Sequence, residues 1–365
     1  MPKTTTSLET PLRDQLDRLA TFASTSLPVL SLYLDMRRDQ NGRAQHGLFL
    51  RKALPERGRA LTGEGKASFD KDAGRINEFL DHDVRKSAQG VAIFACAGAG
   101  DFFEAIQLDT PIEGHSLFLG SVPHLYPLAL VNDQFRRYAA LVVNTNSARL
   151  FVFGLASTES LGAVSNTKTR RTQMGGWSQA RYQRHVENFH LKHMKEVVDL
   201  LDRTVRDEAL TTIIVACDEV ARPMLMEQMP KHLGEKVVDV VSIEAHAPEH
   251  EILEHTLAAM RRHDAETDGE HVRVLLDAWR GGGLGTVGPD ATLRALSLAQ
   301  VEELLIVASP DALSHAAGRP DQDLNELANE LVTQAQQQSA RVRFVEDGAL
   351  LKQVGGVGAI LRFRI

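Results

Sequence analysis

The feature that most constrains this chain is an apolar stripe of helical period between residues 186 and 205. Its edges are Val186, Phe189, Val197 and Leu200 on one side and Met194, Val198, Leu201 and Val205 on the other. Residues at this spacing share one face of a helix, so the pattern predicts a long amphipathic helix. Such a helix buries its stripe against another layer of structure, which favours a layered fold.

A basic loop precedes this helix. Residues Lys168–Arg184 read KTRRTQMGGWSQARYQR, with basic side chains at Lys168, Arg170, Arg171, Arg181 and Arg184 and no carboxylate. The pair Gly175 and Gly176 permits positive φ and close approach to a partner, and the arginines favour a polyanion. Exposure of Trp177 at a loop tip would carry a solvation cost unless its ring packs or stacks on a partner, and a nucleobase is a partner on which it can stack. The competing interpretation is an ordinary turn beside a solvated basic face, and composition alone leaves both open.

The alternation of helix and strand patterns predicts an α/β protein. A chain of 365 residues exceeds one ordinary core, and we expect three α/β domains at residues 1–136, 137–271 and 272–365. In the first domain we expect strands at Val29–Leu34, Gly90–Ala97 and Phe102–Leu108, and helices after Pro11, at Gln45–Leu61 and at Ala73–Leu80.

The middle domain should be a mixed sheet with flanking helices and a protruding Gly-rich loop. Its expected strands are Ala139–Val143, Ala148–Gly154, Thr211–Ala216 and Lys236–Val241, with helices at Glu219–Gln228 and from Pro248. The last domain should be a small α/β/α sandwich. We expect one helix that ends at Gly281 and two further helices at Ala291–Leu298 and Asp321–Gln338. The expected strands are Glu302–Val307, Val342–Val345 and Ala359–Ile365.

Composition excludes several classes of protein. The net charge of −7 excludes a bulk basic coat for nucleic acid, so any RNA contact must use local patches. Cys96 and Cys217 lie in apolar runs without a CxxC pair, which predicts buried free thiols rather than a zinc ribbon or disulfide framework. We find no signal peptide and no apolar run that would span a membrane, so we expect a cytoplasmic protein.

Other motifs give little support to other chemistries. The spelling GxGxxG at Gly283–Gly288 follows a helical pattern rather than a strand, which argues against a dinucleotide site. Ser178 lacks the glycine of a nucleophile elbow, because position 180 is alanine. Two histidine groups, His185, His190 and His193 and then His246, His250 and His255, lack the HExxH pattern. We therefore expect exposed or capping histidines, no metal and no cofactor.

Three stretches together resemble a known family. They are the hairpin RYAALVVNTNSARLFVFG with its following basic loop and helix, the segment GLGTVGPDATLRALSLAQVEELLIVA, and the C-terminal VGGVGAILRFRI. In this order they resemble the bacterial branch of the archaeo-eukaryotic class-one release factors and Pelota. The resemblance covers roughly Arg137–Ile365, and its parts are specific as a series rather than singly.

The resemblance implies a middle domain that enters the ribosomal A site. A Gly-Gly-Gln loop then reaches the peptidyl-transferase centre, where its glutamine positions water against the ester that joins peptide to tRNA. Here the glycines are Gly175 and Gly176, followed by Trp177, Ser178 and Gln179. If Gln179 acts as the glutamine, the loop resembles a GGxxQ variant; if Trp177 takes that place, the loop only plugs the site. The N-terminal segment shows neither the Asn-Ile-Lys-Ser run nor the Tyr-x-Cys pattern of stop-codon reading.

The resemblance leads to one leading hypothesis and two alternatives. The first is a codon-independent rescue factor that hydrolyses peptidyl-tRNA, with Gln179, Gly175 and Gly176 as catalytic residues. The RNA-binding residues would be Lys168, Arg170, Arg171, Trp177, Ser178, Arg181 and Arg184. The second is a ribosome hibernation or stress factor that occupies the A site without hydrolysis, and the third is a nuclease for the tRNA acceptor end. Expected partners are the ribosome, peptidyl-tRNA and a translational GTPase, which relatives use for delivery.

Overall fold

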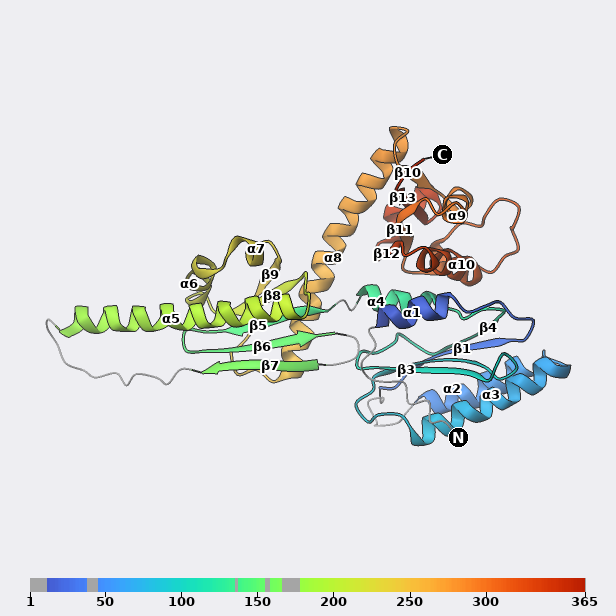
Figure 1. Ribbon diagram of the computed structural model, residues 1–365, viewed down its shortest axis with the longest axis horizontal. Coiled ribbons are helices and arrows are strands. Elements are labelled where there is room, and N and C mark those ends of the chain that lie inside the picture. Colours follow the sequence, from blue (N-terminus) through green and yellow to red (C-terminus); the bar gives the residue numbers. More distant parts are fainter. Residues whose placement is uncertain (1–11, 38–44, 135–136, 155–157, 166–177, 365) are drawn as a thin grey trace. The chain divides into compact units, whose positions relative to one another are not determined.

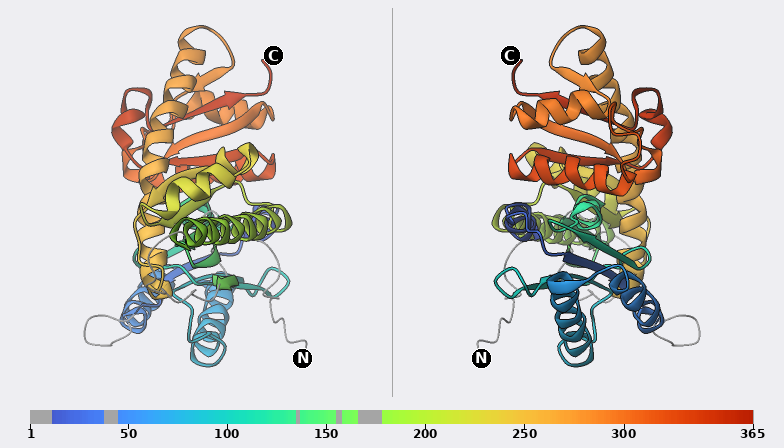
Figure 2. Two further views of the ribbon diagram at one scale, coloured as in Figure 1. Left: turned by 90° about the vertical axis from the view of Figure 1, so that its left-hand side faces the viewer. Right: turned by 90° about the vertical axis from the view of Figure 1, so that its right-hand side faces the viewer.

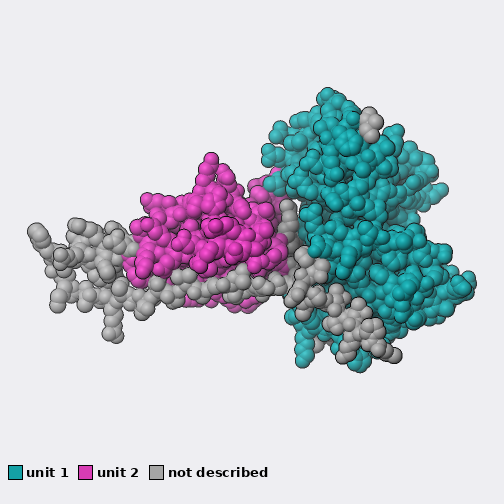
Figure 3. Space-filling view, in the orientation of Figure 1, with its two compact units in different colours: residues 1–135, 267–365 teal, residues 136–266 magenta. Residues whose placement is uncertain are grey.

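A computed structural model describes residues 12–37, 45–134, 137–154, 158–165 and 178–364, with only the backbone described for 158–165 and 178–188 (Figure 1). The chain forms two compact units (Figure 3). Unit 1 combines Met1–Phe135 with Thr267–Ile365, and unit 2 is Arg136–Glu266. The three-domain division stays a prediction, and one continuous helix, α8 (Glu249–Arg280), runs through its second boundary. Among the described helices, none is both long and apolar enough to cross a membrane.

The first sheet of unit 1 is antiparallel, with the strand order β3-β2-β1-β4. Its strands are β1 (Val29–Asp35), β2 (Gly90–Cys96), β3 (Phe102–Leu108) and β4 (Ser116–Gly120). Alternation along β1 turns Leu30, Leu32 and Leu34 towards α2 (His46–Gly58) and α3 (Gly63–His82). The expected strands β1, β2 and β3 are confirmed, and both helices are present.

Further helices of unit 1 are α1 (Leu12–Ala20) and α4 (Tyr126–Gln134). In α1, Leu16 and Leu19 are buried, as the sequence pattern predicts. Strand β4 and helix α4 had no counterpart in the sequence analysis. The strand is short, and α4 begins with Tyr126-Pro127 and lacks a clear polar face, so neither has a strong periodic pattern.

The second sheet of unit 1 has the order β10-β13-β11-β12, with only β11 and β12 parallel. Its elements are β10 (Gly285–Val287), α9 (Pro289–Ser297), β11 (Val301–Val307), α10 (Leu324–Gln337), β12 (Arg341–Val345) and β13 (Val357–Leu361). Figures 1 and 2 show the end of α8 on one side of this sheet and α9 with α10 on the other. The expected α/β/α sandwich is confirmed, although the last strand ends at Leu361 rather than at Ile365.

The GxGxxG segment of this sheet has a packing explanation. A Cβ atom at Gly285 would lie 2.6 Å from the backbone nitrogen of Trp279, so the end of α8 leaves no room for a side chain. Gly288 has φ of 84°, which favours glycine. The segment forms strand β10 and the start of α9 rather than a strand-to-helix phosphate loop.

Unit 2 contains a five-stranded mixed sheet, β7-β6-β5-β8-β9, in which β5, β8 and β9 are parallel. Its strands are β5 (Tyr138–Val143), β6 (Ser147–Phe153), β7 (Thr158–Ser165), β8 (Ile213–Cys217) and β9 (Val237–Val241). Its helices are α5 (Ser178–Asp207), α6 (Ala221–Gln228), α7 (Lys231–Gly234) and the first part of α8. Alternate residues of β5 enter two separate cores, one with α5 and α6 and one with α8. The expected mixed sheet is confirmed.

Candidate functional site

The predicted site residues fall into two groups. Lys168, Arg170, Arg171, Gly175, Gly176 and Trp177 lie outside the described residues. Ser178, Gln179, Arg181 and Arg184 lie in the first two turns of α5, where only the backbone is described. The mutual arrangement of these side chains therefore stays a prediction.

The helical start at Ser178 corrects one expectation. We treated Lys168–Arg184 as a single loop, but its last seven residues are the beginning of α5. The residues after Ser178 are glutamine, alanine and arginine, which are strong helix formers, and no glycine or proline interrupts α5 as far as Asp207. Gln179 is thus set on a helical backbone beside the free N–H groups that begin every α-helix.

The second part of α5 is fixed by apolar packing. Met194, Val197 and Leu201 are fully buried, and Val205 is nearly so. They share one core with β5, β6, β8 and α6. This confirms the predicted apolar stripe from Met194 onward.

His193 reinforces that packing and corrects a second expectation. We expected exposed or capping histidines, but the side chain of His193 is fully buried. Burial lowers the pKa of His193, while hydrogen bonds with the backbone of Asn144 and Ser147 oppose that change. Asn144 lies in the β5–β6 turn and Ser147 begins β6, and the Asn144 Oδ1 accepts the Asn146 and Ser147 N–H groups at 2.9 and 2.7 Å. The turn and α5 therefore hold each other in place.

Several charged side chains on this packed part of α5 form ion pairs with neighbouring residues. Lys192 lies 3.8 Å from Glu196, and Arg206 lies 2.6 Å from Asp202. Asp202 also meets the His232 Nε2 of α7 at 2.8 Å. Cations that are paired along the helix in this way offer little to a polyanion.

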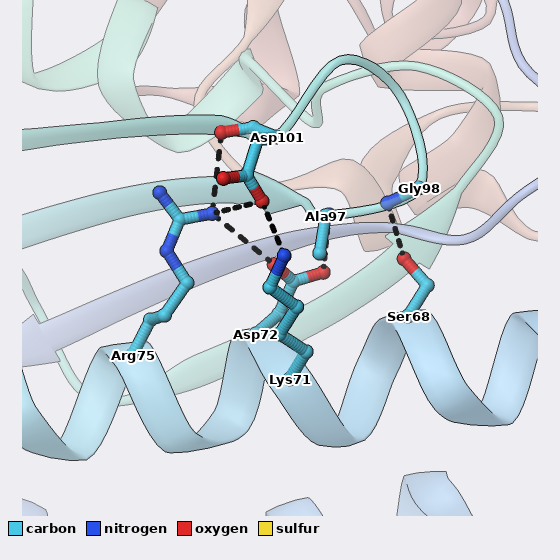
Figure 4. Close-up of polar contacts among 7 residues, drawn as sticks. All are labelled: Ser68, Lys71, Asp72, Arg75, Ala97, Gly98 and Asp101. Atoms are coloured by element: carbon cyan, nitrogen blue, oxygen red, sulfur yellow. Dashed lines mark hydrogen bonds and ion pairs between the residues drawn. The ribbon is translucent and has the colours of Figure 1, made fainter. Parts of the chain in front are cut away.

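A polar cluster in unit 1 was missed by sequence reasoning (Figure 4). Asp72 of α3 is fully buried, and its Oδ2 accepts the Ala97 N–H at 3.0 Å. Ser68 accepts the Gly98 N–H at 2.9 Å, and Lys71 binds Asp101 at 2.7 Å. Burial raises the pKa of Asp72 to about 6, and the Ala97 N–H opposes that rise.

This cluster holds the β2–β3 turn and assembles no catalytic set. The sequence did contain a signal for it, because Asp72 falls at helical spacing between the buried Phe69 and Ile76. A carboxylate inside an apolar stripe needs a partner, and here the partner is a turn backbone. Within the described parts of the chain, no group of three or more His, Cys, Asp or Glu side chains could hold a metal ion.

Two protein families match the chain. Residues 123–261 match the family described as bacterial archaeo-eukaryotic release factor family 10. Residues 272–365 match the domain described as eRF1 domain 3. The first match includes Gly175, Gly176, Gln179 and all of α5, and the second begins just after it along the chain.

Distant solved structures are similar to the chain as well. An archaeal translation termination factor, aRF1, is 19% identical, with 96% of this chain and 97% of that chain covered and a TM-score of 0.27. Pelota from Archaeoglobus fulgidus is 16% identical, with 76% of this chain and 80% of that chain covered and a TM-score of 0.37. Dom34 from S. cerevisiae is 12% identical, with 76% of this chain and 79% of that chain covered and a TM-score of 0.43. No curated protein sequence matches the chain.

Proposed function

Because residues 123–261 match the bacterial archaeo-eukaryotic release factor family 10 and residues 272–365 match eRF1 domain 3, we propose that the chain enters the ribosomal A site and hydrolyses the ester bond of peptidyl-tRNA without reading a codon. The observation that carries this proposal is the family match over residues 123–261, which contains the glycine pair, Gln179 and α5. The eRF1 domain 3 match follows it in the order that a release factor requires.

The proposed chemistry is a single hydrolysis. Water attacks the ester carbonyl carbon, the bond to the tRNA ribose oxygen breaks, and that oxygen leaves with a proton as a hydroxyl. Gln179 orients the water, and its place in the first turn of α5 limits its freedom to move. Gly175 and Gly176 permit close approach of the backbone to RNA, so that N–H groups reach the developing oxyanion.

The basic residues around the glycine pair would bind RNA in this proposal. Up to Asn188, α5 contains Arg181 and Arg184 against the single acid Glu187. Lys168, Arg170 and Arg171 extend the positive charge ahead of the helix, and Trp177 and Ser178 supply stacking and hydrogen bonding. Phosphates of ribosomal RNA or of the tRNA acceptor end are the matching partners. We further expect a translational GTPase to deliver the protein, in the cytoplasm and without a cofactor.

A second function is favoured by one feature of the sequence. Trp177 and Ser178 separate the glycine pair from Gln179, whereas the family's loop has glutamine directly after the glycines. A loop that places tryptophan at the third position could fill the peptidyl-transferase centre without catalysis. The protein would then be a hibernation or stress factor that occupies the A site of empty ribosomes. A nuclease acting on the tRNA acceptor end is a weaker third candidate.

One experiment tests the first proposal and separates it from the others. Bacterial ribosomes carrying labelled peptidyl-tRNA and an empty A site are incubated with wild type, Gln179→Ala, Gln183→Ala and Trp177→Ala, and ribosome binding and released peptide are measured. Gln183 is a matched control, because it lies one helical turn beyond Gln179 on α5. We expect Gln179→Ala to lose release by about a hundredfold or more while it still binds, and Gln183→Ala to retain release.

The other outcomes favour the alternatives. Binding without release, weakened mainly by Trp177→Ala, would replace the hydrolase with an occupancy factor. Shortened tRNA ends after incubation would identify a nuclease. A protein that never co-sediments with ribosomes would contradict both ribosomal proposals.

A further inference from the structure

A polar cleft lies in unit 1, whereas the proposed catalytic segment belongs to unit 2 along the chain. Its volume is about 500 Å³, which is within the usual range for a small-molecule site. One wall is the end of β4 with the connection that leads to α4, and the other wall is one side of α10 from its N-cap to Gln337. Both walls belong to the same compact unit.

His124 is held rigidly in the first wall. Its backbone N–H donates to the Ser31 Oγ at 2.9 Å, and its carbonyl accepts from the Tyr33 hydroxyl at 2.5 Å. Its imidazole stacks on the Phe118 ring, with centroids 3.7 Å apart and an interplanar angle of 12°. These contacts leave His124 only 6% exposed although it lines the cleft.

The imidazole of His124 has unused hydrogen-bonding capacity. Burial lowers its pKa to about 4, so the ring is neutral near pH 7, with one N–H donor and one acceptor nitrogen. Among the residues that the structure describes, none hydrogen-bonds to either ring nitrogen. A ring nitrogen without a protein partner can donate to or accept from a ligand in the cleft.

The facing wall supplies neutral amides. Asn329 is committed to structure, because its side chain accepts the Leu125 N–H at 2.6 Å and donates to the Pro123 carbonyl at 3.2 Å. Gln334 is less committed: its Nε2 donates to the Glu330 Oε1 at 3.4 Å, and its buried Oε1 has no hydrogen-bond partner among the described residues. The cleft thus offers donors and acceptors from both walls beside an aromatic stack.

The charges of the cleft disfavour an anion. Its described lining contains three carboxylates, Asp323, Glu326 and Glu330, against the single guanidinium of Arg57. Asp323 caps α10 by accepting the Asn325 N–H at 2.7 Å. A phosphate would meet a net negative wall, whereas a neutral heterocycle could extend the Phe118–His124 stack and hydrogen-bond through its edge.

We propose that this cleft binds a neutral nucleobase, stacked at the Phe118–His124 pair and hydrogen-bonded by His124 and Gln334. The base can belong to a free nucleoside or to an unstacked residue of RNA, since the recognition chemistry is the same. This site does not depend on the proposed hydrolysis, and its test uses no ribosomes.

The test is binding to the full chain by calorimetry and saturation-transfer NMR. The probes are adenosine, guanosine, cytidine and uridine, then AMP, ribose and a short single-stranded RNA of mixed sequence. We expect at least one nucleoside or the RNA to bind, the AMP to bind more weakly than adenosine, and ribose not to bind. Binding by RNA but by no nucleoside would assign the base to RNA, and nucleoside binding would assign it to a free ligand.

Two variants and one control complete the test. His124→Phe keeps the stack and removes the ring nitrogens, and Gln334→Met keeps the side-chain length and removes the amide. Each should weaken binding by about tenfold. Gln336→Met, on α10 but outside the cleft lining, should leave binding unchanged. Absence of binding by every nucleoside and by RNA, or binding that neither variant weakens, would overturn the proposal, and Gln334→Met decides the matter if His124→Phe fails to fold.

Discussion

Helices α3 and α5, one in each unit, bury a titratable side chain against a neighbouring β-turn. Asp72 of α3 holds the Ala97 N–H of the β2–β3 turn, and His193 of α5 meets the backbone of the β5–β6 turn. Burial disfavours the charged form in both places, so it raises the pKa of Asp72 and lowers the pKa of His193. The same packing requirement therefore gives the two units opposite responses to acid.

The helices differ in what precedes their packed parts. The polar residues of α3 that Figure 4 shows are occupied in holding one turn. In α5 the packed part pairs its own charges, and the proposed RNA-binding arginines come earlier in the helix. This difference suggests that changes in α5 can separate stability from function, whereas changes in α3 affect stability alone.

The largest expected effect tests whether the two helices are equally well packed. Leu201 of α5 and Ile76 of α3 are both fully buried. Replacement of either by alanine should lower the free energy of unfolding by roughly 2–5 kcal/mol, because each leaves a cavity. Urea denaturation followed by circular dichroism measures this, with the exposed Lys195→Ala as control. If the free energy of unfolding fell by less than about 1 kcal/mol at one of the two sites, the two helices would not be equally well packed.

The next effect concerns the charge on Asp72. Its pKa is about 6 in the folded state against 3.8 as the ordinary value, so the stability it contributes is full below 3.8 and is lost as pH rises through 6. Asp72→Asn should therefore stabilise unit 1 at pH 7, by an amount on the order of 3 kcal/mol at most. The gain should shrink as the pH falls below 6.

Urea midpoints at pH 5 and pH 7 measure the Asp72 effect. Asp70→Asn is the control, because Asp70 is exposed on the same helix. If Asp72→Asn destabilised the protein equally at both pH values, the charged carboxylate would be supporting the fold, with help from Arg75 at 3.9 Å.

A smaller effect tests the functional half of the comparison. Under the proposed function, Arg181→Ala combined with Arg184→Ala should weaken ribosome binding by roughly tenfold and should reduce its salt dependence. Arg203→Ala is the matched control, since Arg203 lies later in α5 and bonds the Asp199 carbonyl of the same helix. Equal weakening by the control would show that overall charge, rather than the start of α5, governs binding. Thermal unfolding should be unchanged in both the double variant and the control.

The smallest expected effect is the pH response of His193. Its folded-state pKa is lowered from 6.5, so the stability it contributes is present above 6.5 and is lost as pH falls towards the folded value. His193→Gln should remove this part of the acid sensitivity of unit 2. Amide exchange of β5 and β6 at pH 5 and pH 7 reports it, and an unchanged pH response in the variant would contradict the assignment.

The sequence predicted the elements whose patterns come from burial. Alternation in β1 and the stripe from Met194 to Val205 are both direct results of packing against one or two cores. Strand β7 was missed because Thr158–Ser165 is polar and lies at a sheet edge, where no second core imposes a pattern. The start of α5 was misplaced because a basic composition suggested a loop, although the residues after Ser178 are good helix formers.

The candidate site could be predicted only in part. A glycine pair and its glutamine can be found by motif, since motifs are local in sequence. His124 could not be found, because its position depends on Ser31 and Tyr33, which are distant in sequence. Its burial comes from packing between β4 and α10 that no local pattern records.

The two buried cysteines can report the local unfolding of the unit in which each lies. Cys96 lies on β2 in unit 1 and Cys217 lies on β8 in unit 2, and both thiols are buried. Burial raises the pKa of each thiol, so neither provides much of the reactive thiolate while its strand stays in place. Alkylation at each position therefore reports when that unit opens, and mass spectrometry of the two labelled peptides can time the opening of each unit without any introduced probe.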